Sequence, residues 1–252
     1  MSVLERDSWL DKSIDFIISD IIEYDMRRAG LSISKELHLL SMDSIAKLES
    51  MEKSKSDKQL GIIQRENPEF KSALKEGFKQ FRLKFGEINE LQDSDILSVK
   101  KDAIYTKKYC QFTSIGEHIL FREKNHYEAY MHLNNLELYW NSDGTLDVKG
   151  IAESNVEYHK DYMISFLWKF IAYLSCYDID SARKYLVKFI DDYKFKRLSI
   201  GYYREFNSQS VYSYIMYDSP TTADYLDEKY LPLIIPHYNY LNVLVPLLKF
   251  VM

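Results

Sequence analysis

Glycine and proline are scarce in this chain of 252 residues, which contains 8 glycines and 5 prolines. Sandwiches, propellers and barrels use both residues in many turns, so the scarcity argues against those folds and against a collagen-like or disordered chain. The sequence has two cysteines, Cys110 and Cys176, and neither has a second Cys or a His at ligand spacing. These spacings exclude a structural zinc site and a disulfide framework, and both residues are expected to be buried thiols.

Long hydrophobic runs are also missing. No segment reaches 18 uninterrupted apolar residues, the length that would predict a membrane-spanning helix. The stretch Met1–Leu10 places Glu5, Arg6 and Asp7 before any apolar run, which is not typical of a signal peptide. We therefore expect no membrane association and a cytoplasmic location.

Familiar catalytic motifs are absent, and neither sign of charge dominates. The chain has 33 basic and 38 acidic residues, a formal net charge of -5. That balance excludes a uniformly cationic coat for nucleic acid but not a local basic groove. The Walker phosphate loop, the dinucleotide-binding glycine motif, the zincin motif, the nucleophile elbow and C-x-x-C do not occur. The sequence therefore leaves open whether the protein is an enzyme.

The periodicity of the apolar residues predicts the fold class. Hydrophobic residues make up 46% of the chain and aromatic residues 15%, enough for a substantial core. Residues 1–92 have helical apolar spacing, residues 95–151 alternate as strands do, and residues 156–252 return to helical spacing. We predict a single α+β domain over 1–252, with helical N-terminal and C-terminal segments around a central antiparallel β-meander.

Two helices are predicted in detail within the N-terminal segment. Leu10, Ile14 and Ile17 follow each other at i, i+4 and i+7, which favours a helix at the start of the chain. Farther along, Asn67 can cap a helix whose first residue is Pro68.

A hairpin and a C-terminal helix are the sharpest predictions in the rest of the chain. Asp143-Gly144 lies between the alternating segments Leu136–Trp140 and Thr145–Val148, a strong signal for a tight turn. Tyr158–Tyr177 carries an amphipathic helical pattern.

Two carboxylates suggest a site for a divalent cation. Asp25 and Asp102 each lie next to an apolar, strand-like stretch, and two such carboxylates brought together can hold Mg²⁺ for phosphoryl transfer. The segment from Asp25 to Ser32-Ile33 resembles a palm motif of family B DNA polymerases, which runs from a metal-binding Asp to Ser-Ile at the same spacing. The segment around Asp102-Ala103-Ile104-Tyr105 is similar to the second palm motif, Tyr-Gly-Asp-Thr-Asp-Ser-Ile-Tyr. The resemblance implies that Asp25 and Asp102 are catalytic and metal-binding, with Mg²⁺ as cofactor if the protein is active.

The sequence departs from both palm motifs. Lys100 stands where the second motif has its first Asp, and Ala29-Gly30-Leu31 replaces Leu-Tyr-Pro in the first. A lysine beside a metal carboxylate repels Mg²⁺. The chain is also too short to hold a complete palm, fingers and thumb. These departures favour a degenerate palm-like core without catalytic activity and, in that case, without a cofactor.

A second resemblance extends over most of the chain. The series EYDM at 23–26, ILSVKKDAIY at 96–105, LDVKGI at 146–151 and YYREFN at 202–207 is similar to a family of uncharacterised proteins from tailed bacteriophages. This resemblance implies a phage product that acts in the cytoplasm of the bacterial host.

Basic residues near the second motif are candidates for nucleic-acid binding. Lys100, Lys101, Lys107 and Lys108 flank a strand-like stretch and can follow a phosphate backbone, although such lysines also occur on solvated edge strands. Arg204 lies between aromatic residues that can stack on bases or pack in a core.

Two hypotheses for function follow. The first is a protein of nucleic-acid metabolism or binding with a polymerase-palm-like core. The second is a non-enzymatic phage interaction protein that binds and inhibits or adapts a host or phage protein. The chain has 21 tyrosines, a high number. If they form an interface they support the second hypothesis, and if they fill a core they support neither hypothesis.

Overall fold

The computed structural model describes residues 2–133, 136–141, 143–150, 160–195, 197–198 and 243–252. The chain forms two compact units, the first made of Met1–Ser13 and Ser19–Glu128 and the second of Ile14–Ile18 and Ala129–Met252. Two of the three boundaries between units, after Ile18 and after Glu128, fall within strands β2 (Phe16–Met26) and β5 (Phe121–Leu133). The prediction of one domain over the whole chain stays a prediction.

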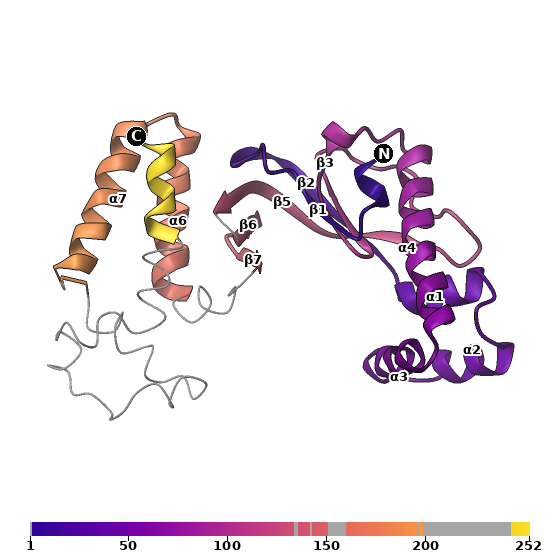
Figure 1. Ribbon diagram of the computed structural model, residues 1–252. Coiled ribbons are helices and arrows are strands. Elements are labelled where there is room, and N and C mark those ends of the chain that lie inside the picture. Colours follow the sequence, from indigo (N-terminus) through magenta and orange to yellow (C-terminus); the bar gives the residue numbers. More distant parts are fainter. Residues whose placement is uncertain (1, 134–135, 142, 151–159, 196, 199–242) are drawn as a thin grey trace, which may run out of the picture. The chain divides into compact units, whose positions relative to one another are not determined.

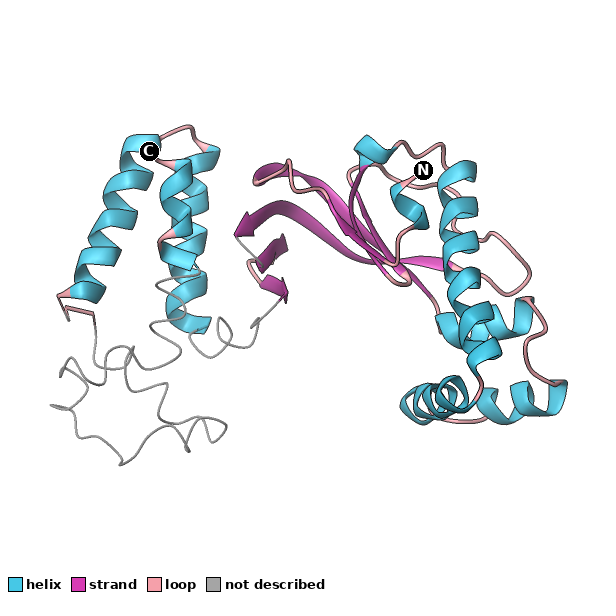
Figure 2. Ribbon diagram, viewed as in Figure 1, coloured by secondary structure: helices cyan, strands magenta, loops and turns pink. Residues whose placement is uncertain are grey.

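The protein is α+β, as the sequence predicts (Figures 1 and 2). Its antiparallel strands form a seven-stranded sheet in the order β1-β3-β4-β2-β5-β6-β7. The strands are β1 (Ser8–Leu10), β2 (Phe16–Met26), β3 (Ile96–Lys100), β4 (Ala103–Thr106), β5 (Phe121–Leu133), β6 (Leu136–Asn141) and β7 (Leu146–Gly150). The helices are α1 (Ala29–Glu36), α2 (Met42–Glu49), α3 (Lys53–Glu66), α4 (Pro68–Ile88), α6 (Lys160–Ser175) and α7 (Ile179–Lys194).

The start of the chain corrects one prediction. The segment around Ile14 and Ile17 was expected to be helical, but residues 16–26 form β2, which lies between β4 and β5. Isoleucine, phenylalanine and tyrosine dominate this segment, and such side chains fit a pleated sheet better than a helix. The helical spacing of a few isoleucines was therefore a coincidence within a strand rich in β-branched residues.

In the first unit, helices pack on one face of the strands. Ile22 and Tyr24 of β2 share a buried cluster with Ile104 of β4 and with Leu74 and Phe85 of α4. Helix α4 begins as predicted, because Asn67 Oδ1 accepts a hydrogen bond of 2.9 Å from Phe70 N and Pro68 is the first helical residue. The buried cluster holds this helix against β2, which carries Asp25, and against β4, which begins directly after Asp102.

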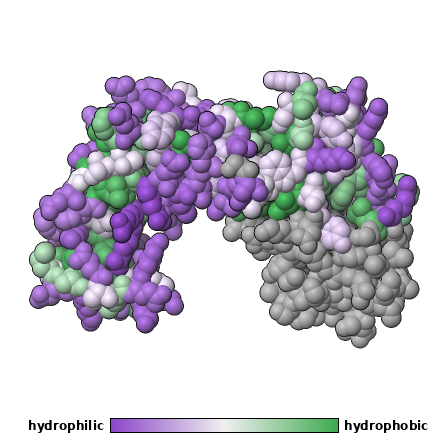
Figure 3. All heavy atoms as spheres, turned by 180° about the vertical axis from the view of Figure 1, so that it is seen from behind, coloured by the Kyte–Doolittle hydropathy of each residue, from purple (hydrophilic) through white to green (hydrophobic). Residues whose placement is uncertain are grey.

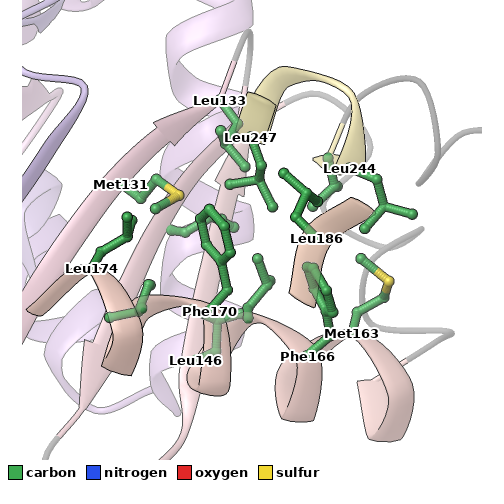
Figure 4. Packing of buried hydrophobic residues seen from close by; sticks show 14 of the residues in the cluster. Met131, Leu133, Leu146, Met163, Phe166, Phe170, Leu174, Leu186, Leu244 and Leu247 are labelled. Carbon is green, nitrogen blue, oxygen red and sulfur yellow. The ribbon is translucent and has the colours of Figure 1, made fainter. Parts of the chain in front are cut away.

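In the second unit, α6 and α7 pack with strand residues and the C-terminal segment. Figure 4 shows Phe166 and Phe170 of α6 pointing toward Leu186 of α7 and Leu247 of the 3-10 helix Pro246–Phe250. Helix α6 confirms the predicted amphipathic helix. Within the segment 156–252, for which helical spacing was predicted, residues 156–159, 196 and 199–242 lie outside the described residues.

The hairpin between β6 and β7 is confirmed. Gly144 N donates to Asn141 O at 3.1 Å, and Gly144 has a φ of +84°. Trp168 Nε1 of α6 donates to Gly144 O at 2.6 Å, which ties the turn to the helix. The positive φ explains why glycine occupies this position.

The two cysteines differ in their exposure to solvent. Cys110 is buried, as expected, whereas Cys176 is exposed just after α6. The sequence around Cys176 is aromatic, but the end of a helix leaves such a side chain in water.

Candidate functional site

The sheet brings the two predicted carboxylates together. In the antiparallel pair of β2 and β4, Asp25 lies opposite Ala103, and Met26 N donates to Asp102 O at 3.2 Å. Asp102 lies in the turn between β3 and β4, where Lys101 has a φ of 54°. Strand pairing therefore places residues from distant parts of the sequence at one end of β2.

Asp25 and Asp102 line one pocket of about 350 Å³, called here the Asp25 pocket. Four cationic residues share its lining: Arg28, Lys53, Arg122 and Lys124. Leu74 and Phe78 of α4 provide an apolar wall. Besides its carboxylates, the pocket thus has cations and an aromatic ring, the groups that contact phosphates and bases in nucleic-acid sites.

The two carboxylates differ in their electrostatic surroundings. Burial raises the pKa of the Asp102 carboxyl, and the nearby Asp25 carboxylate raises it further. Arg122 Nη2 lies 3.4 Å from Asp25 Oδ2 and offsets the charge of Asp25. A cation placed between the two carboxylates would relieve the repulsion that Asp102 experiences.

A buried network holds Lys124 at the edge of the pocket. Glu23 is 1% exposed, and its carboxylate accepts hydrogen bonds from Lys124 Nζ at 2.9 Å, Asn125 Nδ2 at 2.7 Å and Tyr127 Oη at 3.0 Å. Burial alone would raise the pKa of Glu23, but the hydrogen bonds from Lys124 and Asn125 outweigh it and the pKa is lowered. Glu23 is therefore a charged anchor that fixes the position of Lys124.

Arg82 of α4 fixes the turn that carries Asp102. Its side chain is fully buried, and it donates to Leu4 O at 3.0 Å, to Arg6 O at 2.8 Å and to Lys101 O. One guanidinium thus ties the N-terminal segment and the β3–β4 turn to α4.

The described residues meet only part of the requirement for a metal centre. No three Asp, Glu, His or Cys side chains among them are grouped to hold a metal ion. Magnesium is often bound by one or two protein carboxylates together with phosphate oxygens and water. Asp25 and Asp102 fit that second arrangement, in which Mg²⁺ enters with a phosphate ligand.

The predicted basic residues do not gather at one point. Lys100 Nζ lies 5.4 Å from the centroid of the Tyr105 ring, and Lys101 is exposed beside Asp102. Lys107 and Lys108 follow the other end of β4. Lys108 Nζ donates to Asn89 O at 3.0 Å and Glu90 O at 2.9 Å at the end of α4, which is a structural role. Arg204 lies outside the described residues.

Four cationic residues of the Asp25 pocket were not among the site residues predicted from the sequence: Arg28, Lys53, Arg122 and Lys124. Arg122 and Lys124 are two apart in β5 and pair with Asp25 and Glu23, which are two apart in β2. This matching alternation of charge was visible in the sequence, but the partner strand was predicted to be a helix.

Most of the described tyrosines of the sheet belong to the interior. Tyr24, Tyr105, Tyr127, Tyr130 and Tyr139 are each at most 2% exposed. The described part of the chain therefore accounts for these tyrosines as core residues and not as an exposed interface.

Comparison with known proteins gives one family. A family model described as bacteriophage PBS1 gene 130 protein matches residues 1–252. No curated protein matches the chain. No helix in the described ranges is long and apolar enough to cross a membrane.

Proposed function

We propose that this chain, which belongs to the family of the bacteriophage PBS1 gene 130 protein, binds nucleic acid through a degenerate polymerase-palm-like core in the cytoplasm of the bacterial host. The observation that carries the proposal is the shared pocket of Asp25 and Asp102. Both residues were selected from the two short palm-like motifs alone. Their common pocket supports the idea that the two segments form one site.

Contrary to the expectation that a degenerate core has no cofactor, Asp25 and Asp102 would hold Mg²⁺ together with a phosphate of the nucleic acid. When bound, the ion neutralises negative charge on phosphate oxygens. Arg122 and Lys124 are held near the pocket by Asp25 and Glu23, so they add positive charge without free movement of long side chains. Phe78 offers a half-buried ring on which a base can stack.

The same pocket supports binding over catalysis. Lys100 replaces a carboxylate of the second motif, and the Arg122 guanidinium already contacts Asp25. Two-metal phosphoryl transfer places its ions about 3.5–4 Å apart and needs enough carboxylates to hold both. The residues of the pocket therefore agree with a degenerate site that binds a phosphate group without transferring it.

The test measures binding of a fluorescent single-stranded oligonucleotide and of a duplex, with Mg²⁺ and with EDTA. With Mg²⁺, the double variant Asp25→Asn, Asp102→Asn should bind at least about a hundredfold more weakly than the wild type, because it loses two ion contacts that contribute about 1.5–3 kcal/mol each. With EDTA, the same variant should bind equally well or better, since it lacks two negative charges. Loss of binding in both conditions would contradict a role for the metal.

Two further outcomes decide between the hypotheses. Primer extension with Mg²⁺ or Mn²⁺ should give no product if the core is degenerate, and incorporation abolished by Asp25→Asn would establish an active enzyme instead. No oligonucleotide binding at micromolar protein in about 50 mM salt, where nonspecific binding is strong, would overturn the proposal. A stoichiometric protein partner from infected cells would then support the interaction-protein hypothesis.

A further inference from the structure

A second pocket of about 390 Å³ lies next to the Asp25 pocket, because Arg28 lines both. We call it the arginine pocket. Its lining includes Arg27, Ser32, Lys35 and His118 besides Arg28. The residues come from the β2–α1 connection, from α1 and from the loop that precedes β5.

Arg28 is held in an uncommon backbone conformation. It precedes α1 in the left-handed region, with a φ of 48° and a ψ of 45°. Such a conformation costs a non-glycine residue free energy and is often retained where a side chain must be aimed at a site. Leu31 N and Ser32 N both donate to Arg28 O, at 2.9 Å and 3.0 Å, which fixes this residue at the helix start.

The guanidinium of Arg28 is only partly satisfied. Its Nη2 donates to Leu48 O at 3.1 Å, whereas its Nε is buried and has no hydrogen-bond partner among the described residues. A buried donor without an acceptor is costly and is commonly satisfied by a bound ligand or water. Because Arg28 lines the pocket and its guanidinium makes only the bond to Leu48 O among the described residues, an anionic ligand there would supply the missing acceptors.

Hydrogen bonds tie the loop that precedes β5, which forms part of the pocket lining, to helix α1. The Glu36 carboxylate of α1 accepts hydrogen bonds from His118 N at 2.7 Å and Glu117 N at 3.3 Å. A Cβ at Gly116 would clash with this carboxylate, so glycine permits the close approach. The bond to Glu36 therefore fixes the backbone of His118, which lines the same pocket as Arg28.

The cationic side chains of the pocket differ in whether another residue already pairs with them. Lys35 Nζ is paired with Glu49 Oε1 at 2.9 Å. In the part of the chain that the structure describes, the exposed Arg27 side chain has no ion pair or hydrogen bond. Glu117 also lines the pocket, but its side chain is 85% exposed and directed largely to water.

We propose that the arginine pocket binds a phosphate group. A guanidinium presents several N–H donors in a plane that matches phosphate oxygens, and two consecutive arginines provide two such groups. The inference rests on the proposed function in one respect: because Arg28 lines both pockets, a strand bound in the Asp25 pocket can present a neighbouring backbone phosphate to the arginine pocket. A free nucleotide or inorganic phosphate has the same chemistry.

The first experiment measures the affinity of the full chain for pyrophosphate by isothermal titration calorimetry. Arg27→Ala should weaken binding about tenfold, since it removes a charged hydrogen-bond donor. Lys84→Ala removes an exposed lysine of α4 that lines none of the pockets described here, and it should leave the affinity unchanged. Arg28→Gly is the second variant, because glycine accepts the left-handed backbone and removes the guanidinium without strain.

The variants of the Asp25 pocket separate this proposal from the proposed function. Asp25→Asn, Asp102→Asn should not weaken pyrophosphate binding measured in EDTA. Equal affinities of wild type, Arg27→Ala and Arg28→Gly, or no binding by the wild type, would overturn the phosphate site. The phosphate site would also be overturned if only the Asp25 and Asp102 substitutions weakened pyrophosphate binding.

An oligonucleotide identifies the source of the phosphate. If Arg27→Ala and Arg28→Gly weaken both pyrophosphate and single-stranded DNA, the site takes a backbone phosphate. If they weaken pyrophosphate alone, the site takes a free phosphate compound and stands even where the proposed nucleic-acid function fails.

Discussion

The Asp102 carboxyl lies partly out of water beside the Asp25 carboxylate, and both conditions raise its pKa above the ordinary value of 3.8. The folded protein therefore holds the Asp102 proton more tightly than the unfolded chain does. The free energy of unfolding decreases as the pH rises through 3.8 and then through the raised pKa, and above that point the full penalty remains. At neutral pH the ionised Asp102 thus destabilises the fold that carries it.

Asp102→Asn should make the protein more stable at pH 7, because the neutral amide removes the charge that burial and Asp25 disfavour. We expect a gain of about 0.5–2 kcal/mol, the range of stabilising single changes, in the free energy of unfolding measured with urea. Asp57→Asn, an exposed residue of the same pocket, should change it by less than about 0.5 kcal/mol. A loss of stability in Asp102→Asn would show that its carboxylate is structural.

A thiol reagent should modify the two cysteines at very different rates. Burial raises the pKa of the Cys110 thiol to about 12, and Cys176 is exposed. Because the thiolate is the reactive form, a thiol reagent at pH 8 should modify one cysteine per native chain quickly and both in urea. Cys176→Ser should abolish the fast reaction, and fast modification of that variant would contradict the buried position of Cys110.

At this scale, the short motifs contain two acidic residues that line one pocket, whereas none of the lysines predicted from the sequence lines it. Asp25 and Asp102 could be paired because each belongs to a short motif with its own spacing. Arg122 and Lys124 belong to no motif, and their role depends on which strand lies beside β5. That neighbour is set by the strand order of the sheet, which local sequence does not specify.

Among elements, β2 shows why local periodicity can mislead. A central strand is buried on much of both faces, so its sequence lacks the clean alternation of an edge strand. In β2 the consecutive residues Ile21, Ile22, Glu23 and Tyr24 are all buried. The hairpin of β6 and β7 was predictable because its signal, Asp143-Gly144, lies within a few residues.

Gly144→Val should destabilise the second unit through the β6–β7 turn. Gly144 has a φ of +84°, which a β-branched residue adopts only with strain, and we expect a loss of about 1–2 kcal/mol. A Cβ at this position would lie 3.9 Å from Trp168 Nε1, an ordinary contact, so conformation and not crowding is the cause. Gly144→Asn should cost less, because asparagine tolerates positive φ. Equal thermal shifts for the two variants would contradict this explanation.

Arg82 connects α4 to two other elements, and its removal should be costly. Arg82→Met keeps most of the side-chain volume but leaves the carbonyl oxygens of Leu4, Arg6 and Lys101 without their donor. Unsatisfied buried acceptors cost about 1–3 kcal/mol each, so we expect at least about 3 kcal/mol in urea unfolding. Arg65→Met removes an exposed arginine of α3 and should cost less than about 0.5 kcal/mol.

Across the whole molecule, the sign of the charge is distributed unevenly. The chain carries a net charge of -5, but cations rim both the Asp25 pocket and the arginine pocket. Hydrophilic side chains cover much of the face shown in Figure 3, with apolar ones between them. Net charge therefore opposes nonspecific association with nucleic acid, while local charge favours binding at the two pockets.

This distribution leads to a prediction about salt. Single-stranded DNA that contacts about four phosphates should bind with a slope of log K against log salt near -3, since each phosphate contributes about -0.7. Lys53→Glu reverses an exposed charge in the Asp25 pocket, so it should weaken binding for all sequences and flatten the slope by about 0.7–1. Lys58→Glu changes the net charge equally on the same helix but lies outside the pockets described here. If both variants flatten the slope to the same extent, net charge and not the pocket governs binding, and the pocket would lose its role in holding the strand.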